Sequence, residues 1–282
     1  MSIMRYVEYE AYGKINLLLN VLGKRPDGYH ELCTIMHTID LCDRVRMEPA
    51  AATSVTADIP LPLQNAAYRA AEAYRIAAGT DGAKISLQCR IPGEGGLGSS
   101  SADAAAVLRG MEALYGALGE ERLFSIAATI GADVPFCLAG GAALCEGIGE
   151  RITPLPPMPL DLLIVKGARG VSTKALFNAL ALPLPQGDAG AAVAALRAGD
   201  RRALAQCVFN ALAAPAARVA PETEGYAARL KKHGAIAAAM TGSGSAVFGI
   251  FESRTDALRA KEAFSDAAFA QVCRTLPFSP EK

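Results

Sequence analysis

The chain has 282 residues, of which 51% are hydrophobic and 20% are charged, enough for one large or two modest domains with buried cores. Its 28 Lys and Arg residues balance its 28 Asp and Glu residues, so no overall charge favours nucleic acid or an anionic membrane. Polar residues interrupt the N-terminal apolar run, which therefore predicts neither a secretory signal nor a membrane span. We expect a cytoplasmic protein without nucleic-acid or membrane partners.

The seven cysteines are scattered along the chain, form no CxxC pair and stand at no zinc-like spacing from a histidine. This usage is typical of reduced thiols that pack as small hydrophobic side chains. The sequence therefore predicts no disulfide framework and no dedicated metal cluster.

Two long strands are predicted near the N-terminus. Apolar and polar residues alternate from residue 14 to residue 21, with Lys14, Asn16 and Asn20 on one face. Polar groups that recur on one face of a strand suggest that this face lines a cleft. Residues 25–28 (RPDG) are a turn signal, and residues 31–49 are predicted to return as a second strand.

Helical and extended patterns then alternate up to a proline-rich segment. Residues 65–78 have helical spacing, and residues 84–91 are a predicted strand that stops at Pro92. Apolar residues between 104 and 118 predict an amphipathic helix, and a second helix ends at Gly131. A glycine-rich strand region follows at 140–155. Residues 154–159 (PLPPMP) are the best candidate linker and place a domain boundary between residues 156 and 157.

The second part of the chain is also mixed. The sequence predicts a strand at 160–166, a helix at 172–180, helices joined by turns over 189–220, two strands joined by a TGSGS turn over 236–251, a helix at 255–264 and a last strand. Because strands and helices do not follow a regular βαβ repeat, the pattern favours the α+β class over a doubly wound sheet.

The stretch IPGEGGLGSSSADAA, residues 91–105, precedes the amphipathic helix. A dinucleotide-binding GxGxxG loop is rejected because a second helix, not a strand, follows the first. A P-loop would need a lysine after the glycines, and a hydrolase GxSxG elbow would need a further glycine. Ser100 and Asp103 form an S-x-x-D capping box, but a cap alone needs no glycines. Glycines at a helix N-terminus instead predict an anion cradle, for which nucleotide phosphate fits best.

Three separated stretches carry a family resemblance. They are GKINLLLNVLGKRPDGYHEL, the loop Pro92-Gly93-Glu94-Gly95-Gly96-Leu97-Gly98-Ser99-Ser100-Ser101-Ala102, and MTGSGSAVFGIF. In this order they resemble the galactokinase–homoserine kinase–mevalonate kinase–phosphomevalonate kinase (GHMP) superfamily. That resemblance implies a two-lobed α+β fold, with an N-terminal lobe like domain 2 of ribosomal protein S5 over 1–156 and a ferredoxin-like C-terminal lobe over 157–282.

Within the superfamily, the stretches KINL, LGKRPDGYHEL and GADVPF resemble the branch that acts on a cytidine diphosphate-linked methylerythritol. The resemblance implies ATP-dependent phosphorylation of the 2-hydroxyl of that compound in the non-mevalonate route to isoprenoid precursors. Mg²⁺ is expected to arrive with ATP, and the chain is expected to be a monomer or homodimer with small-molecule partners. The alternatives are another small-molecule kinase of the superfamily, such as a homoserine kinase, or a catalytically silent nucleotide-binding paralogue.

The resemblance also implies roles for individual residues. Asp133, in a turn before Pro135, corresponds to the general base, and Lys14 to the cation beside it. The loop from Pro92 to Ala102 would hold the ATP phosphates. The implied contacts to the cytidyl substrate come from Asn16, Tyr29, His30 and Phe177. Two positions depart from the family pattern, namely Cys89 and the run Asn210-Ala211-Leu212-Ala213.

Overall fold

The computed structural model describes residues 6–277 of the chain, which divides into two compact units. Unit 1 comprises Met1–Gly13, Leu41–Ile91 and Gly98–Ala139, and unit 2 comprises Lys14–Asp40, Pro92–Leu97 and Gly140–Lys282. The strands β1 (Val7–Lys24) and β2 (His30–Ala50) each contribute residues to both units. The loop of residues 92–98 likewise changes unit between Leu97 and Gly98.

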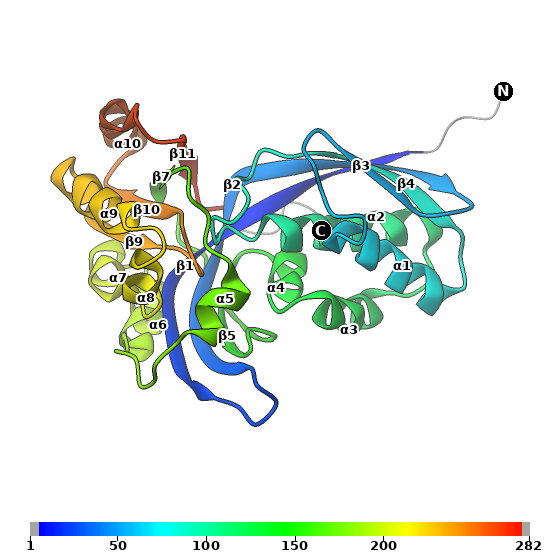
Figure 1. Cartoon of the computed structure of the whole chain (residues 1–282), viewed down its shortest axis with the longest axis horizontal. Helices are drawn as coiled ribbons and strands as arrows, with labels where there is room; N and C mark the ends of the chain where they lie inside the picture. The colour runs from blue at the N-terminus through cyan, green and yellow to red at the C-terminus, as the bar shows by residue number, and fades with distance from the viewer. Residues whose placement is uncertain (1–5, 278–282) are drawn as a thin grey trace. The chain divides into compact units, whose positions relative to one another are not determined.

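Unit 1 contains a mixed sheet that is covered by helices. In this unit β3 (Ser54–Ala57) runs parallel to β4 (Gly82–Gln88), and β4 pairs antiparallel with the second half of β2. Gly110 lets a helix approach β2 closely, because a Cβ at this position would collide with the Met47 side chain. Four helices lie on one side of these strands (Figure 1): α1 (Ala66–Ala78), α2 (Ser99–Tyr115), α3 (Glu120–Ile130) and α4 (Val134–Ala139).

Unit 2 contains strands of two sheets. The first half of β2 pairs antiparallel with β5 (Ala142–Gly147), which pairs with β6 (Arg151–Leu155). The unit 2 part of β1 pairs parallel with the two-residue strand β8 (Phe209–Asn210). The second sheet is antiparallel in the order β11-β7-β10-β9, formed by β7 (Asp161–Lys166), β9 (Ala237–Met240), β10 (Val247–Phe251) and β11 (Phe269–Arg274).

Helices of unit 2 bury one face of the antiparallel sheet (Figure 1). Alternate residues of β7, Leu163 and Val165, belong to a core that also includes Tyr226 and Leu230 of α9 and Phe264. The helices of this unit are α5 (Thr173–Asn178), α6 (Ala189–Ala198), α7 (Arg201–Cys207), α8 (Ala213–Ala217), α9 (Glu222–Lys232) and α10 (Arg254–Lys261), followed by a 3₁₀ turn (Glu262–Phe264).

The mixed α+β architecture with two sheets confirms the predicted class, while several local predictions need correction. The strands β3 and β8 and the helix α4 were not predicted. The strand expected at 84–91 ends at Gln88, because the N–H groups of Arg90 and Ile91 bond to the Asp43 carboxylate and not to a neighbouring strand. The boundary at 156/157 stays a prediction. All seven cysteines are free thiols.

The capping box predicted from Ser100 and Asp103 is wrong. The N-cap of helix α2 is Gly98, two residues before Ser100, and no side chain caps the helix. Asp103 lies one turn inside the helix with 5% of its surface exposed, so it is a buried residue and not a reciprocal cap. The first N–H groups of α2 therefore have no competing side-chain acceptor. Such a helix start suits an anion better than a capped one does.

Candidate active site

The three stretches singled out in the sequence come together in unit 2. The Lys14 N–H donates to the Leu97 carbonyl at 2.9 Å, and the N–H groups of Ser245 and Ala246 donate to the carbonyls of Glu94 and Gly95 at 3.0 and 3.1 Å. Residues 94–97 are therefore held between β1 and the turn that joins β9 to β10. All three bonds join backbone to backbone, so they depend on chain path and not on side-chain chemistry.

Gly96 is the closest point of this packing. Its φ of +71° is a left-handed conformation that favours glycine, and a Cβ would collide with the Thr241 carbonyl oxygen and lie 3.0 Å from the Gly244 nitrogen. The Thr241 hydroxyl bonds to the Gly96 carbonyl at 3.3 Å. The glycine pattern of the loop thus serves close backbone packing at this position.

Unit 1 supplies the helix that continues from the loop. Gly98, the N-cap of α2, has a φ of +77°, and the Ser100 hydroxyl that follows is exposed. An uncapped start of a 17-residue helix carries partial positive charge and open N–H donors. This end of α2 can therefore bind an anionic group such as a phosphate.

Lys14 and Asn16 form a buried polar group in unit 2. Only 3% of Lys14 and 2% of Asn16 is exposed, so Lys14 is not a solvated surface lysine. The Lys14 Nζ donates to Asn16 Oδ1 at 2.7 Å, and the Asn16 side chain donates to the Thr34 hydroxyl at 2.8 Å. The Asn16 N–H also donates to the Thr241 hydroxyl at 3.0 Å. These bonds fix the orientation of a buried ammonium group on a residue whose backbone N–H contacts residue 97.

Asp133 lies in unit 1, in the turn that precedes α4, as the sequence predicted for its local structure. Its carbonyl accepts the Cys137 N–H at 3.0 Å and so begins the helix, and the residue is half-buried. The role of Asp133 as general base and its pairing with Lys14 stay predictions.

Two of the predicted substrate contacts meet in unit 2. The rings of His30 and Phe177 lie 5.2 Å apart, centroid to centroid, with a 45° tilt. Burial, followed by the charge of Lys24, lowers the pKa of His30, so its neutral ring offers one donor and one acceptor near pH 7. Tyr29, next in the chain, is 61% exposed, and its N–H bonds to Asp27. An exposed tyrosine therefore precedes, in the chain, a histidine whose ring contacts Phe177.

The sequence alone assigns no positioning role to two residues, Asn210 and Thr241. The Asn210 amide donates to the carbonyls of Met240 and Gly242 at 2.7 and 2.9 Å, and its oxygen accepts the Leu212 N–H. Asn210 therefore holds the turn that contacts the loop, together with Thr241. Thr241 opens the TGSGS turn that the sequence singled out, whereas only the family pattern drew attention to Asn210, which stands in no local motif with a recognisable function.

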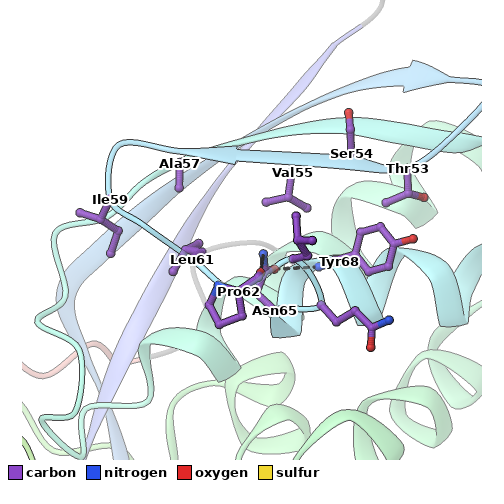
Figure 2. Close-up of a pocket in the computed structure, with 11 residues that line it drawn as sticks. Thr53, Ser54, Val55, Ala57, Ile59, Leu61, Pro62, Asn65 and Tyr68 are labelled. Carbon is purple, nitrogen blue, oxygen red and sulfur yellow. Dashed lines mark hydrogen bonds between the residues drawn. The ribbon is translucent and has the colours of Figure 1, made fainter.

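A pocket of about 530 Å³ lies in unit 1 between β3 and the start of α1. Figure 2 shows apolar side chains from β3 and the following loop around it, with Asn65 and Tyr68 at the helix end. The loop is tied to the end of β4 because Asp58 Oδ1 accepts the Cys89 N–H at 2.9 Å. The lining residues are Thr53, Ser54, Val55, Ala57, Ile59, Leu61, Pro62, Leu63, Gln64, Asn65 and Tyr68.

Residues 6–277 contain neither a membrane-spanning helix nor a ready-made cluster of metal ligands. Among the helices of this range, none combines the length and the apolarity that crossing a bilayer would require. In the same range, no group of three or more His, Cys, Asp or Glu side chains is arranged to hold a metal ion.

The family models for "GHMP kinases N terminal domain" and "GHMP kinases C terminal" match residues 65–141 and 192–271. These ranges hold the loop, Asp133 and the turn at 241–245. The chain therefore belongs to the GHMP kinases, which are small-molecule kinases that use ATP as a substrate.

Individual relatives show which branch of the GHMP kinases this chain resembles most in sequence and in structure. The chain is 42% identical over 263 residues to a 4-diphosphocytidyl-2-C-methyl-D-erythritol kinase of Caldicellulosiruptor saccharolyticus, covering 90% of this chain and 91% of the relative. A crystal structure of 4-(cytidine 5'-diphospho)-2C-methyl-D-erythritol kinase matches with a TM-score of 0.83 and 38% identity, covering 95% of this chain and 99% of the other. A homoserine kinase of Cytophaga hutchinsonii, at TM-score 0.76, 20% identity and coverage of 99% and 97%, shows the fold alone.

Proposed function

We propose that this chain is an ATP-dependent kinase that phosphorylates the 2-hydroxyl of 4-diphosphocytidyl-2-C-methyl-D-erythritol, a step in isoprenoid precursor synthesis. The observation that carries the proposal is the loop at 94–97, fixed by backbone bonds to Lys14 and to residues 245–246 and followed by an uncapped helix. Relatives that match 90% and 95% of this chain, at 42% and 38% identity, are named as kinases of that compound. A homoserine kinase or a silent paralogue is not favoured.

Phosphoryl transfer needs charge neutralisation, alignment of the acceptor hydroxyl and a group that takes its proton. In the proposed mechanism the loop and the first turn of α2 bind the ATP phosphates through backbone N–H groups. Asp133 accepts the proton of the acceptor hydroxyl as the hydroxyl oxygen bonds to the γ-phosphorus, and the bond from that phosphorus to the β,γ-bridging oxygen breaks, so that ADP leaves. Lys14, held by Asn16, supplies the positive charge that keeps the acceptor oxygen and the base in their reactive states.

Mg²⁺ is proposed to arrive with ATP and to neutralise phosphate charge. This ion prefers hard oxygen ligands and retains several water molecules. The exposed hydroxyl of Ser100, at the start of α2, is an oxygen donor of the right type on this chain. The protein's own contribution is to hold the phosphate oxygens in place through the loop.

The two nucleotide bases are proposed to occupy different places. The apolar pocket in unit 1 has walls and volume that suit the purine of ATP, and its loop is tied to the strand that leads to the phosphate loop. The cytosine of the acceptor is proposed to contact Tyr29, His30 and Phe177. A cytoplasmic location, a monomeric or homodimeric state and the boundary at 156/157 remain predictions.

The test is a coupled assay with ATP and the cytidyl substrate, with homoserine as a second acceptor. We expect turnover with the cytidyl compound only. Asp133→Asn keeps the shape and removes the base, so turnover should fall by about 10²–10⁴-fold while both Michaelis constants change little. Asp200→Asn, at an aspartate that likewise precedes a short helix, should behave as wild type. Near-normal turnover of Asp133→Asn would remove it from the reaction.

A further inference from the structure

Asp43 is a buried carboxylate on β2 that is bonded to both ends of the phosphate loop. None of its surface is exposed. Its Oδ1 accepts the Ile91 N–H at 2.7 Å and also the Arg90 N–H, and its Oδ2 accepts the Ser99 hydroxyl at 3.1 Å. One side chain in unit 1 therefore holds the two residues before Pro92 and the first residue of α2.

This arrangement has a free-energy cost that needs a reason. Burying a carboxylate is unfavourable unless hydrogen bonds compensate for lost water, and Asp43 has three donors for this purpose. The two N–H groups belong to residues that have left the sheet, since β4 ends at Gln88. Without Asp43 they would be buried or half-buried donors without a partner in the described residues, and the loop ends would be free to move apart.

We propose that Asp43 is a positioning residue for ATP: it fixes the two ends of the phosphate loop before nucleotide binds, without touching the nucleotide itself. The inference rests on the proposed function, because it assumes that this loop binds phosphate. Fixing both ends lowers the conformational entropy that the loop would lose on binding. Preorganisation of this kind should appear as affinity for the nucleotide and not as affinity for the acceptor.

A second buried carboxyl group, that of Asp103, interacts with Asp43. Asp103 faces Asp43 from the first turns of α2, and its Oδ1 has no hydrogen-bond partner in the described residues. Burial, and then the charge of Asp43, raise the pKa of Asp103 to about 8, so Asp103 holds a proton near pH 7. Burial also raises the pKa of Asp43, while its bonds to Ile91, Arg90 and Ser99 lower it. Burial raises the pKa of the Cys89 thiol to about 12.

The experiment compares the affinity for ADP, measured by calorimetry, with both Michaelis constants. Asp43→Ala should weaken ADP binding and raise the Michaelis constant for ATP by about 10–100-fold, the usual effect of losing hydrogen bonds to a charged group. The constant for the cytidyl substrate should change less than about threefold. Asp43→Asn should recover most of the affinity, because the amide oxygen accepts both N–H groups and the amide nitrogen can donate to Ser99.

The matched control is Asp40→Ala, on the same strand. Asp40 is exposed and accepts a single backbone N–H, that of Arg274, at 2.8 Å. This variant should leave ADP affinity and both Michaelis constants unchanged. The comparison therefore distinguishes the effect of removing an aspartate from this strand from the effect of removing the bonds to the loop.

A second measurement keeps the inference testable if Asp43→Ala does not fold. In wild type, the amide hydrogens of Arg90 and Ile91 should be protected from exchange before ADP is added, and ADP should change that protection little. Amides that exchange freely until ADP binds would overturn the inference, as would unchanged ADP affinity or an equal loss for both substrates in Asp43→Ala. An inactive wild type that still binds ADP would contradict the proposed function instead, because the ADP measurements do not depend on the acceptor.

Discussion

The interior and the ends of the phosphate loop are held by different kinds of bond. Residues 94–97, in unit 2, are held by backbone groups of Lys14, Ser245 and Ala246. The ends, in unit 1, are held by the Asp43 side chain. A backbone-held segment tolerates most changes of side chain but not a new Cβ at a point of contact. A segment held by a side chain depends on the hydrogen bonds of that one residue.

The largest expected effect comes from adding a Cβ to the interior. Gly96→Ala places a methyl group against the Thr241 carbonyl at a φ of +71°. The left-handed conformation costs about 1–2 kcal/mol and the overpacking about 1–3 kcal/mol, so unfolding in urea should show a loss of about 2–5 kcal/mol. Binding of ATP should weaken as well, because the loop must move to relieve the collision.

Gly93→Ala is the control for this substitution. Gly93 is exposed, has no left-handed φ, and an added Cβ would meet nothing within 4 Å. Its stability should stay within about 0.5 kcal/mol of wild type. Equal losses at Gly93 and Gly96 would mean that the loop needs glycine for flexibility throughout and not for packing at one point.

The interior of the loop could be predicted from sequence, while its anchoring could not. Glycines before a helical pattern are a local signal, and so is the alternation that places Lys14 and Asn16 on one face of a strand. Asp43 bonds to residues 48 and 56 positions away, and nothing in its neighbourhood distinguishes a buried aspartate from an exposed one. Its contacts follow from the pairing of β2 with β4, which the sequence does not specify.

Asp103 shows how a correct local pattern gave a wrong prediction. The S-x-x-D spacing is typical of a cap, but the N-cap is Gly98, two residues before Ser100, and Asp103 falls on the buried face. Helix ends are uncertain by a residue or two in any sequence prediction, and two residues turn the helix by about 200°. The short strands β3 and β8 were missed because four or two residues carry too little periodicity.

An intermediate effect is expected for the residues proposed to contact the acceptor substrate, which make none of the bonds that hold the loop. Tyr29→Ala removes an exposed ring whose stacking on a base is worth about 1–3 kcal/mol. The Michaelis constant for the cytidyl substrate should rise by about 5–150-fold, with that for ATP almost unchanged.

Leu22→Ala supplies the control, since Leu22 is 57% exposed on the strand that leads into the same turn. It should leave both constants unchanged. If Tyr29→Ala weakens both substrates equally, or leaves the cytidyl compound unaffected, Tyr29 does not contact the acceptor. The methylerythritol phosphate that lacks the base should be a very poor acceptor of wild type, because it leaves the polar groups around His30 unpaired.

The smallest effect concerns the pH dependence of the free energy of unfolding, through the buried carboxyl group of Asp103 beside Asp43. The pKa of Asp103 is raised to about 8, above its value near 3.9 in the unfolded chain, so the folded state binds more protons between these values. Stability from this group is therefore full below about pH 4 and is lost as pH rises towards 8.

Between pH 6.5 and 8 the loss in wild type should be about 1–2 kcal/mol, measured by urea unfolding, and Asp103→Asn should abolish it. The buried His37, whose pKa is lowered to about 4, is neutral in the folded state throughout this window. Its unfolded pKa is near 6.5, so it destabilises the fold mainly below this window, and its small change within the window has the opposite sign. Gly96→Ala, by contrast, should be destabilised equally at both pH values, because its collision involves no titrating group. A wild-type free energy of unfolding that is flat over this window, or one that falls equally in Asp103→Asn, would show that Asp103 is already ionised beside Asp43.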